Sequence, residues 1–331
     1  MGRCKLEEFI SYEQPTKYIV DSDQYDDSYK IPVLTAGKSF ILGYTDEKNN
    51  IFDNLPVIIF DDFTTSVQFV DFPFKVKSSA MKLLKNTEQA DIKYCYYLLK
   101  FLQHTPENHK RQWLSATSQN IVELPIIEKQ KNIVRKLDKI LEVIDNQNKQ
   151  LELLDEAIKA RFVEMFGEIE DCDKWESKIW NEVVTIKNGR DYKKVLVSDG
   201  GYPVVGTGGE IARASKYLCP ENTIVVGRKG SINNPMLMKE KFWNVDTAFG
   251  VIPNSDYLHY QYFYCFCKFY NFMKLNKATT LPSTTKADLL KIRINIPPLE
   301  LQNQFASFVQ EIDKSRLLSN HSLFLIKSII F

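Results

Sequence analysis

The chain has 331 residues, of which 44% are hydrophobic and 12% are aromatic, so it can fill the cores of two domains. Its net charge is only +1, and composition alone therefore does not indicate a nucleic-acid partner. No run approaches the roughly 18 apolar residues of a membrane span, and the first residues, MGRCKLEEFISYEQ, lack the apolar core of a signal peptide. We expect a cytoplasmic protein.

The first 125 residues predict a domain that mixes strands and helices. Strand-like runs, IPVLTAG at 31–37 and NLPVIIF at 54–60, are separated by turn residues. An amphipathic helical stretch, IKYCYYLLKFLQ at 92–103, follows them. We therefore expect residues 1–125 to form the first domain.

A long helix is predicted next, from about residue 128 to residue 166, because no Pro or Gly interrupts this stretch. Mostly apolar residues recur along this stretch at alternating steps of four and three, and so form a stripe on one face of the helix. Such a stripe is typical of a coiled-coil seam, which needs a partner helix. The stripe consists of Ile133, Leu137, Ile140, Ile144, Gln147, Leu151, Leu154 and Ile158. We assign residues 126–168 to this central helical spacer.

Residues 169–297 repeat the order of the first domain. Strand-like runs occur at 202–206 (YPVVG), 222–227 (NTIVVG) and 249–253 (FGVIP), and an aromatic helical stretch follows at 257–274. The two regions share this order while their loops differ in length and residue type, so we expect one architecture with two different sets of loops.

The two halves end in related helices. LPIIEKQKNIV (124–134) and IPPLELQNQFA (296–306) align without gaps at an offset of 172 residues, and a second stripe keeps that offset. The second stripe consists of Phe305, Val309, Ile312, Arg316, Ser319, Leu323, Ile326 and Ile330. The chain is thus predicted as an α+β protein with an internal repeat, in which two related domains are separated by an antiparallel pair of long helices at 126–168 and 298–331.

Motifs that carry catalysis or bind metals are missing from the sequence. There is no phosphate-binding P-loop, no nucleophile elbow and no zinc-protease motif. VVGTGGEIARA (204–214) lacks the third small residue of a dinucleotide loop, and none of the six cysteines forms a C-x-x-C pair. We expect reduced, buried cysteines, no metal and no catalytic residue.

Basic, amide and hydroxyl side chains gather in loops, and these are the types that contact phosphates and base edges. A solvated loop is the alternative for each position. In the second domain the candidates are Lys187, Asn188, Arg190, Lys193, Arg228, Lys229, Ser231, Asn233, Thr279, Thr280, Ser283, Thr284 and Lys286. In the first domain they are Thr64, Thr65, Gln68, Arg111, Gln112, Ser115, Thr117 and Gln119.

Several segments together resemble the specificity subunit of type I restriction-modification systems. They are the two helix-opening motifs, ARFVEMFG (160–167), WESKIWNEVVTIKNG (175–189) and TLPSTTKADLLKIRINIPPLE (280–300). The first copy departs from the pattern, since Pro125-Ile126 replaces Pro-Pro and LSATSQNIVELP (114–125) is expected to be shorter than its counterpart.

The resemblance implies a DNA-binding subunit that catalyses nothing. Each domain would recognise one half of a split asymmetric DNA sequence, and the helices would act as a ruler and as the docking site for two methyltransferase subunits. S-adenosylmethionine, ATP and Mg would be bound by those subunits and by restriction-translocase subunits, and none by this chain. Two alternatives remain, namely a type II system with a fused methyltransferase-nuclease, and a coiled-coil adaptor that does not bind DNA.

Overall fold

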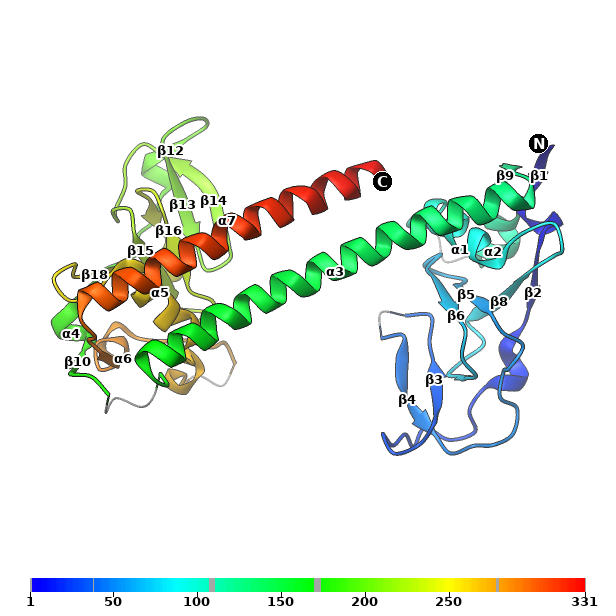
Figure 1. Cartoon of the computed structure of the whole chain (residues 1–331), viewed down its shortest axis with the longest axis horizontal. Coiled ribbons are helices and arrows are strands. Elements are labelled where there is room, and N and C mark those ends of the chain that lie inside the picture. The colour runs from blue at the N-terminus through cyan, green and yellow to red at the C-terminus, as the bar shows by residue number, and fades with distance from the viewer. Residues whose placement is uncertain (1, 38, 107–110, 170–173, 278–279, 331) are drawn as a thin grey trace. The chain divides into compact units, whose positions relative to one another are not determined.

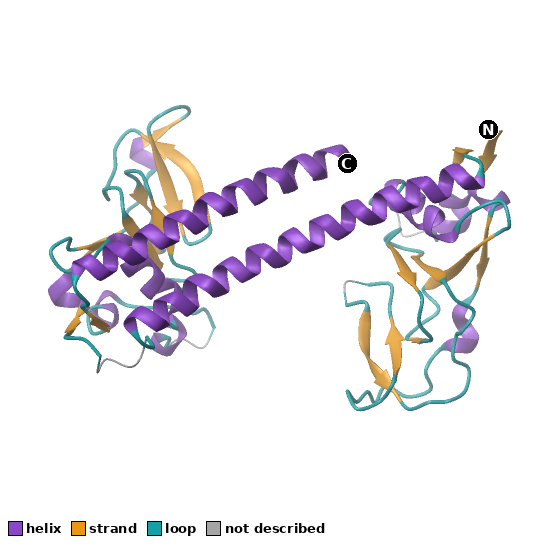
Figure 2. Cartoon of the chain, in the orientation of Figure 1, coloured by secondary structure: helices purple, strands orange, loops and turns teal. Residues whose placement is uncertain are grey.

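The computed structural model describes residues 2–37, 39–106, 111–169, 174–277 and 280–330, with no side chains described for residues 321 and 324–330. The chain divides into two compact units, residues 1–143 and 144–331. Each unit is built from small sheets and short helices (Figures 1 and 2). None of the described helices is long and apolar enough to cross a membrane.

The described residues of the first unit form three sheets. The main sheet has the order β2 (Ile10–Glu13), β8 (Met81–Asn86), β5 (Val57–Asp61) and β6 (Val67–Val70). The second has the order β4 (Ile41–Thr45), β3 (Ile31–Leu34) and β7 (Lys75–Val76), and β1 (Gly2–Lys5) pairs with β9 (Ile121–Leu124). The helices are α1 (Ile92–Phe101) and α2 (Gln112–Ser115), with 3-10 turns at Leu6–Glu8, Pro15–Tyr18 and Thr117–Gln119.

The main sheet of the first unit is covered on both faces. Ile58 and Phe60 of β5 belong to the cluster that includes Trp113, whereas Val57 and Ile59 belong to a second cluster that includes Leu34 of β3. Successive side chains of a strand point to opposite faces, so a strand that is buried on both faces is apolar throughout. This burial explains the continuous apolar run that predicted β5.

The second unit repeats this arrangement of sheets, with one more strand in its second sheet. Its main sheet has the order β11 (Val184–Asn188), β18 (Ala248–Pro253), β15 (Thr223–Gly227) and β16 (Met236–Met238). The second sheet has the order β12 (Leu196–Val197), β14 (Gly209–Ala214), β13 (Tyr202–Gly206) and β17 (Trp243–Asn244), and β10 (Ser177–Ile179) pairs with β19 (Arg293–Asn295). The helices are α4 (Trp180–Val183), α5 (Tyr260–Phe269) and α6 (Lys286–Leu289), with 3-10 turns at Lys193–Val195 and Phe272–Leu275.

The predicted repeat is confirmed down to the strand register. β3 pairs in parallel with β7, and β13 pairs in parallel with β17. The Gln112 N–H donates to the Asp62 carbonyl at 2.8 Å, and the Thr284 N–H donates to the Arg228 carbonyl at 3.0 Å. The offset of 172 residues therefore extends back to Gln112. The expectation that the segment at 114–125 is shorter than its counterpart was wrong, because the difference in length between the two copies lies before Thr284.

The two long helices are α3 (Ile127–Phe166) and α7 (Leu299–Ile330), close to the predicted ranges. In the second unit, the Phe162 and Phe305 rings lie 5.5 Å apart, and the Arg316 Nη2 lies 2.9 Å from the Asp155 Oδ1. Positions earlier in α3 thus contact positions later in α7. The helices run antiparallel, as predicted.

The predicted stripe is the more buried face of both helices. Along α3 its members from Ile133 to Leu154 are half-buried, and Ile158 is buried. Along α7 the buried members are Phe305, Val309, Ile312 and Leu323, and the half-buried members are Arg316 and Ser319. The side chains of Ile326 and Ile330 lie outside the described residues.

Candidate nucleic-acid interface

The candidate residues of the second domain meet at one end of its main sheet. β11 and β15 are both antiparallel to β18, so their last residues lie at the same edge of the sheet, where β18 begins. Lys187 and Asn188 end β11, and Arg228 and Lys229 directly follow β15. The topology thereby brings together Lys187 and Arg228, which are 41 residues apart in the sequence.

A tight turn at 244–247 holds the two strand ends. The Arg190 N–H donates to the Asn244 carbonyl at 2.9 Å, and the Arg228 N–H donates to the Thr247 carbonyl at 2.8 Å. Gly189 is needed here, because a Cβ at this position would lie 1.8 Å from the Val245 carbonyl oxygen. The strand ends are therefore fixed by backbone contacts.

Asn244 is a positioning residue that the sequence analysis missed. It is fully buried, and its Nδ2 donates to the carbonyls of Lys187, at 3.3 Å, and Ala248, at 3.1 Å. A buried polar side chain must be hydrogen-bonded, and Asn244 meets this requirement by bonding to the backbone beneath the candidate interface. The only sequence signal was a polar residue within the strand-like segment WNVDTAFG.

The segment at 280–286 joins the same edge. Lys229 and Ser283 form a β-bridge, and the Gly230 N–H donates to the Pro282 carbonyl at 2.9 Å. The Lys286 Nζ donates to the Ile186 carbonyl of β11 at 2.9 Å. Three stretches nominated from the sequence thus form one surface.

Most candidates of the second domain are accessible, and one is not. The exposed ones are Lys187, Asn188, Arg190, Lys193, Arg228, Lys229, Ser231, Asn233, Thr280 and Lys286, and Ser283 is half-buried. Thr284 is buried, and its hydroxyl donates to the Gly227 carbonyl at 2.8 Å, so its role is structural and the expectation of a DNA contact is corrected. Thr279 lies outside the described residues.

The edge carries positive charge that is not neutralised locally. Within the described part of the chain, no carboxylate lies within salt-bridge distance of Lys187, Arg190, Arg228 or Lys229. The Arg228 guanidinium lies 5.9 Å from the centroid of the Phe249 ring, and its Nη1 donates to the Asp246 carbonyl at 3.4 Å. Free cations on one exposed edge are suited to a polyanion.

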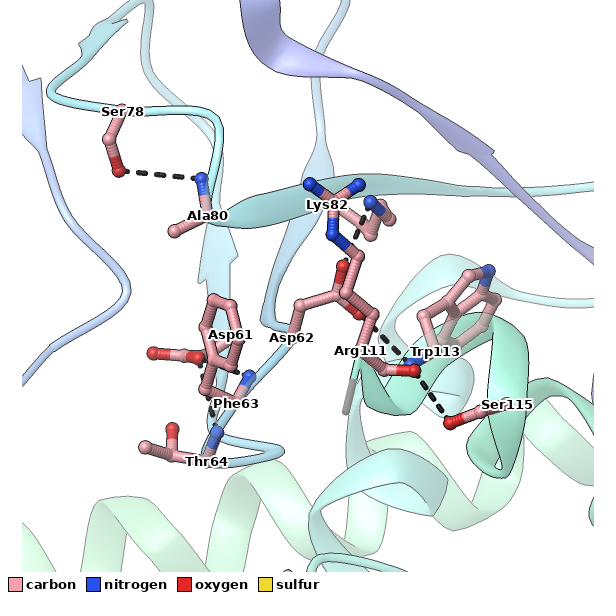
Figure 3. Close-up of polar contacts among 10 residues, drawn as sticks. All are labelled: Asp61, Asp62, Phe63, Thr64, Ser78, Ala80, Lys82, Arg111, Trp113 and Ser115. Carbon is pink, nitrogen blue, oxygen red and sulfur yellow. Dashed lines mark hydrogen bonds and ion pairs between the residues drawn. The ribbon is translucent and has the colours of Figure 1, made fainter. Parts of the chain in front are cut away.

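The corresponding end of the first domain is built differently (Figure 3). Asp62 follows β5 and is buried, with its Oδ2 2.8 Å from the Nζ of buried Lys82. Its Oδ1 accepts from the Trp113 N–H at 3.0 Å, and the Asp61 Oδ1 accepts from the Thr64 N–H at 3.1 Å (Figure 3). The loop after β5 is thereby tied to α2.

Three candidates of the first domain do not lie at an accessible surface. Thr65, Gln112 and Thr117 are buried, and the Thr65 hydroxyl donates to the His104 carbonyl at 2.6 Å. These three expectations are corrected, because buried hydroxyls and amides satisfy nearby polar groups. Gln119 is exposed, and its amide bonds the side chains of Glu7 and Lys5, so its contact with DNA stays a prediction.

The remaining candidates of the first domain are accessible. Thr64, Arg111 and Ser115 are exposed, and Gln68 is half-buried on β6. The Ser115 hydroxyl donates to the Arg111 carbonyl at 2.6 Å, at the start of α2 (Figure 3). Because Arg111 precedes Gln112, whose N–H bonds Asp62, its side chain starts from the same end of the sheet as Thr64.

Cys95, Cys219, Cys265 and Cys267 are buried in the cores, and Cys4 is half-buried. Burial raises the pKa of Cys95, Cys219 and Cys265 to about 12, so these thiols are protonated at neutral pH. Among the described residues, no group of three or more His, Cys, Asp or Glu side chains could hold a metal ion. Cys172 lies outside the described residues.

The second half of the chain is similar to known proteins. Residues 172–326 match the family described as type I restriction modification DNA specificity domain. The specificity subunit of the type I restriction enzyme EcoR124I/EcoR124II from Escherichia coli is 49% identical over 147 residues. That alignment covers 40% of this chain and only 36% of the relative.

Solved structures show the fold of the whole chain. The S subunit of a type I restriction-modification system from M. genitalium matches with a TM-score of 0.67 and 15% identity, over 99% of this chain and 93% of that one. A structure from work on complex assembly and conformational transition of the type I R-M system matches with a TM-score of 0.59 and 14% identity, over 99% of this chain and 95% of that one. These matches confirm the predicted fold, and the predicted resemblance agrees with the family match of residues 172–326.

Proposed function

We propose that this chain, of which residues 172–326 match the family described as type I restriction modification DNA specificity domain, is the sequence-specific DNA-binding subunit of a type I restriction-modification complex. The observation that carries the proposal is the exposed basic edge at Lys187, Arg190, Arg228 and Lys229, which is held by a rigid turn.

DNA recognition at this edge would combine two kinds of contact. Lysine and arginine side chains bind phosphates and supply affinity that depends on salt. Asn188 and Ser231 present an amide and a hydroxyl group that can read base edges, whereas the Asn233 Oδ1 already accepts from the Phe272 N–H at 2.7 Å. The backbone hydrogen bonds of the 244–247 turn would fix both sets before DNA arrives, so little ordering remains to be done on binding.

The first domain would recognise the other half of a split asymmetric site. Its exposed Thr64, Arg111 and Ser115 lie at the equivalent end of the repeat. Because the two domains share a sheet order but not their loop residues, each would read a different sequence. The helix α3 connects them in the chain and would act as the ruler.

Partner subunits would supply the chemistry. We expect two methyltransferase subunits that use S-adenosylmethionine and restriction-translocase subunits that use ATP and Mg, acting with this chain in the cytoplasm. Apolar side chains on the outer faces of the helices support docking of a protein, since Leu153, Leu317 and Leu318 are 61%, 69% and 72% exposed. The chain itself would bind none of these cofactors.

A domain exchange tests the proposal. Replacing residues 174–296 with the equivalent domain of a relative should change one half of the methylated sequence and leave the other half intact, as read from the methylome of cells that carry the complete system. If both halves change together, or neither does, the two-reader model is wrong.

A gel-shift experiment separates DNA binding from an adaptor role. The purified chain should bind random duplexes at low salt and lose affinity steeply as salt rises, because counterion release drives the contact. A chain that binds no duplex at any salt concentration would favour the adaptor. A neighbouring reading frame that fuses methyltransferase and nuclease would instead indicate a type II system.

A further inference from the structure

Gln130, in the first turn of α3, is fully buried. Its Oε1 accepts from the Asp91 N–H at 2.8 Å, and its Nε2 donates to the carbonyls of Pro125, at 2.7 Å, and Gln89, at 3.1 Å. One side chain therefore binds both the segment that enters the long helix and the segment that enters α1.

Gln302, 172 residues later in the first turn of α7, makes the same set of contacts. It is also fully buried. Its Oε1 accepts from the His259 N–H at 2.7 Å, and its Nε2 donates to the carbonyls of Pro297 and Tyr257, both at 2.8 Å. The equivalent backbone groups are bound in both copies, although the reading loops of the two domains differ.

Only an amide can make this set of contacts. Glutamine offers one acceptor oxygen and two N–H donors on one planar group, whereas an ionised glutamate cannot donate and an apolar side chain can do neither. All three bonds go to backbone groups, so they fix the path of the chain on both sides of the junction. The surrounding apolar contacts are non-directional, so they do not select these particular backbone partners.

We propose that Gln130 and Gln302 are positioning residues that fix the direction in which each recognition domain leaves its long helix, and so set the spacing at which the two half-sites are read. The inference rests on the proposed function and adds a determinant of spacer length. The hydrogen bonds are directional, so their loss frees the angle between domain and helix while leaving the loops of each domain unchanged.

Gln302→Met tests the inference, because Met has a similar volume and no strong hydrogen-bonding group. The protein is assayed in complex with its methyltransferase partner, on duplexes that carry both half-sites with the native spacer or with one base pair added or removed. The wild type should prefer the native spacer. The variant should lose about tenfold of that preference, which corresponds to about 1.4 kcal/mol, while base preference within each half-site is unchanged.

Gln304→Met is the matched control, because Gln304 lies on the same turn of α7 and is exposed. This control should keep the wild-type preference for the native spacer. A Gln302→Met complex that melts at a lower temperature but keeps full spacer preference would overturn the inference, since the residue would then serve stability alone.

Gln302→Glu is the second variant if Gln302→Met does not fold. Its carboxyl keeps the acceptor for the His259 N–H but places an oxygen against two carbonyls, so spacer preference should fall here too, and unchanged preference would again overturn the inference. If the wild-type complex shows no preference for duplexes that carry the half-sites, the proposed function is wrong. If the wild-type complex shows that preference and the variants keep the wild-type spacer preference, only the inference about Gln302 is wrong.

Discussion

The two domains place different chemistry on the same backbone position. Lys82 pairs with Phe60 in the first domain, and Phe249 pairs with Val226 in the second. Lys82 and Phe249 therefore occupy equivalent positions of the two main sheets. The residue that follows the buried strand is the acid Asp62 in one copy and the base Arg228 in the other. Each of these two residues accepts, through its carbonyl, the backbone N–H from the segment that precedes the long helix.

The difference shows how one scaffold carries two specificities. In the first domain Asp62 forms a buried ion pair with Lys82, so neither charge is available to a ligand. In the second domain Arg228 is exposed over Phe249, and its charge is available to a ligand. Because the backbone hydrogen bonds are the same, the side chains at this position can change without altering the path of the loop.

Breaking the buried pair should have the largest effect. Lys82→Met leaves the Asp62 carboxylate buried without its counter-charge, which we expect to cost about 3–5 kcal/mol of unfolding free energy. Urea denaturation of the first domain within the full chain would measure the loss. The matched variant Arg228→Met should stay within about 0.5 kcal/mol of the wild type, because its charge is exposed. Equal losses at the two positions would remove the contrast between the domains.

Shortening a side chain of the helix seam should cost more unfolding free energy in α7 than at the repeat-equivalent position of α3. Phe305 is fully buried against Phe162 and Phe166, so Phe305→Ala should cost about 3–5 kcal/mol. Its repeat counterpart Ile133 is half-buried, and Ile133→Ala should cost less than about 2 kcal/mol, because its side chain remains partly in water. Denaturation followed by circular dichroism would compare the two. A larger loss at Ile133 would show that the seam is misassigned in the first copy.

Removing the exposed charge should weaken DNA binding while leaving the fold unchanged. Arg228→Ala should cost about 1–3 kcal/mol of binding energy if a base contact is lost, or lower the salt slope by about one unit if a phosphate contact is lost. Fluorescence anisotropy at several salt concentrations distinguishes the two cases. Glu221→Ala, at an exposed position that precedes β15, is the control, and an Arg228→Ala variant with unchanged affinity and slope would remove this loop from the interface.

The smallest effect concerns pH and the ion pair between α3 and α7. Burial raises the pKa of Asp155, but hydrogen bonds from Lys268 and Arg316 outweigh burial, and the net pKa lies below the ordinary value of 3.8. A lowered folded-state pKa contributes stability at neutral pH that is lost as the pH falls below about 4. The melting temperature of the wild type should therefore approach that of Asp155→Asn between about pH 4 and pH 2. A gap that does not narrow over this range would mean that the ion pair adds no stability. The repeat counterparts of Asp155 and Arg316 are Lys327 and Ile144, so the ion pair is a feature of one copy.

The long helices, the repeat and the strand-like runs could be predicted from the sequence, because the periodicity of apolar residues and the turn residues act locally. The exposed loop that carries Arg228 and Lys229 was predicted in the same way, whereas Lys187, also expected in a loop, lies in β11. The burial of Thr65, Gln112, Thr117 and Thr284, and the three backbone bonds of Gln130 and of Gln302, could not be predicted, because the groups involved are far apart in the chain. The Thr284 hydroxyl bonds a carbonyl 57 residues away, and the Gln302 amide bonds a backbone N–H 43 residues away. A polar residue has the same identity in the sequence whether it meets water or a distant backbone group, and only the packed fold brings that group within reach.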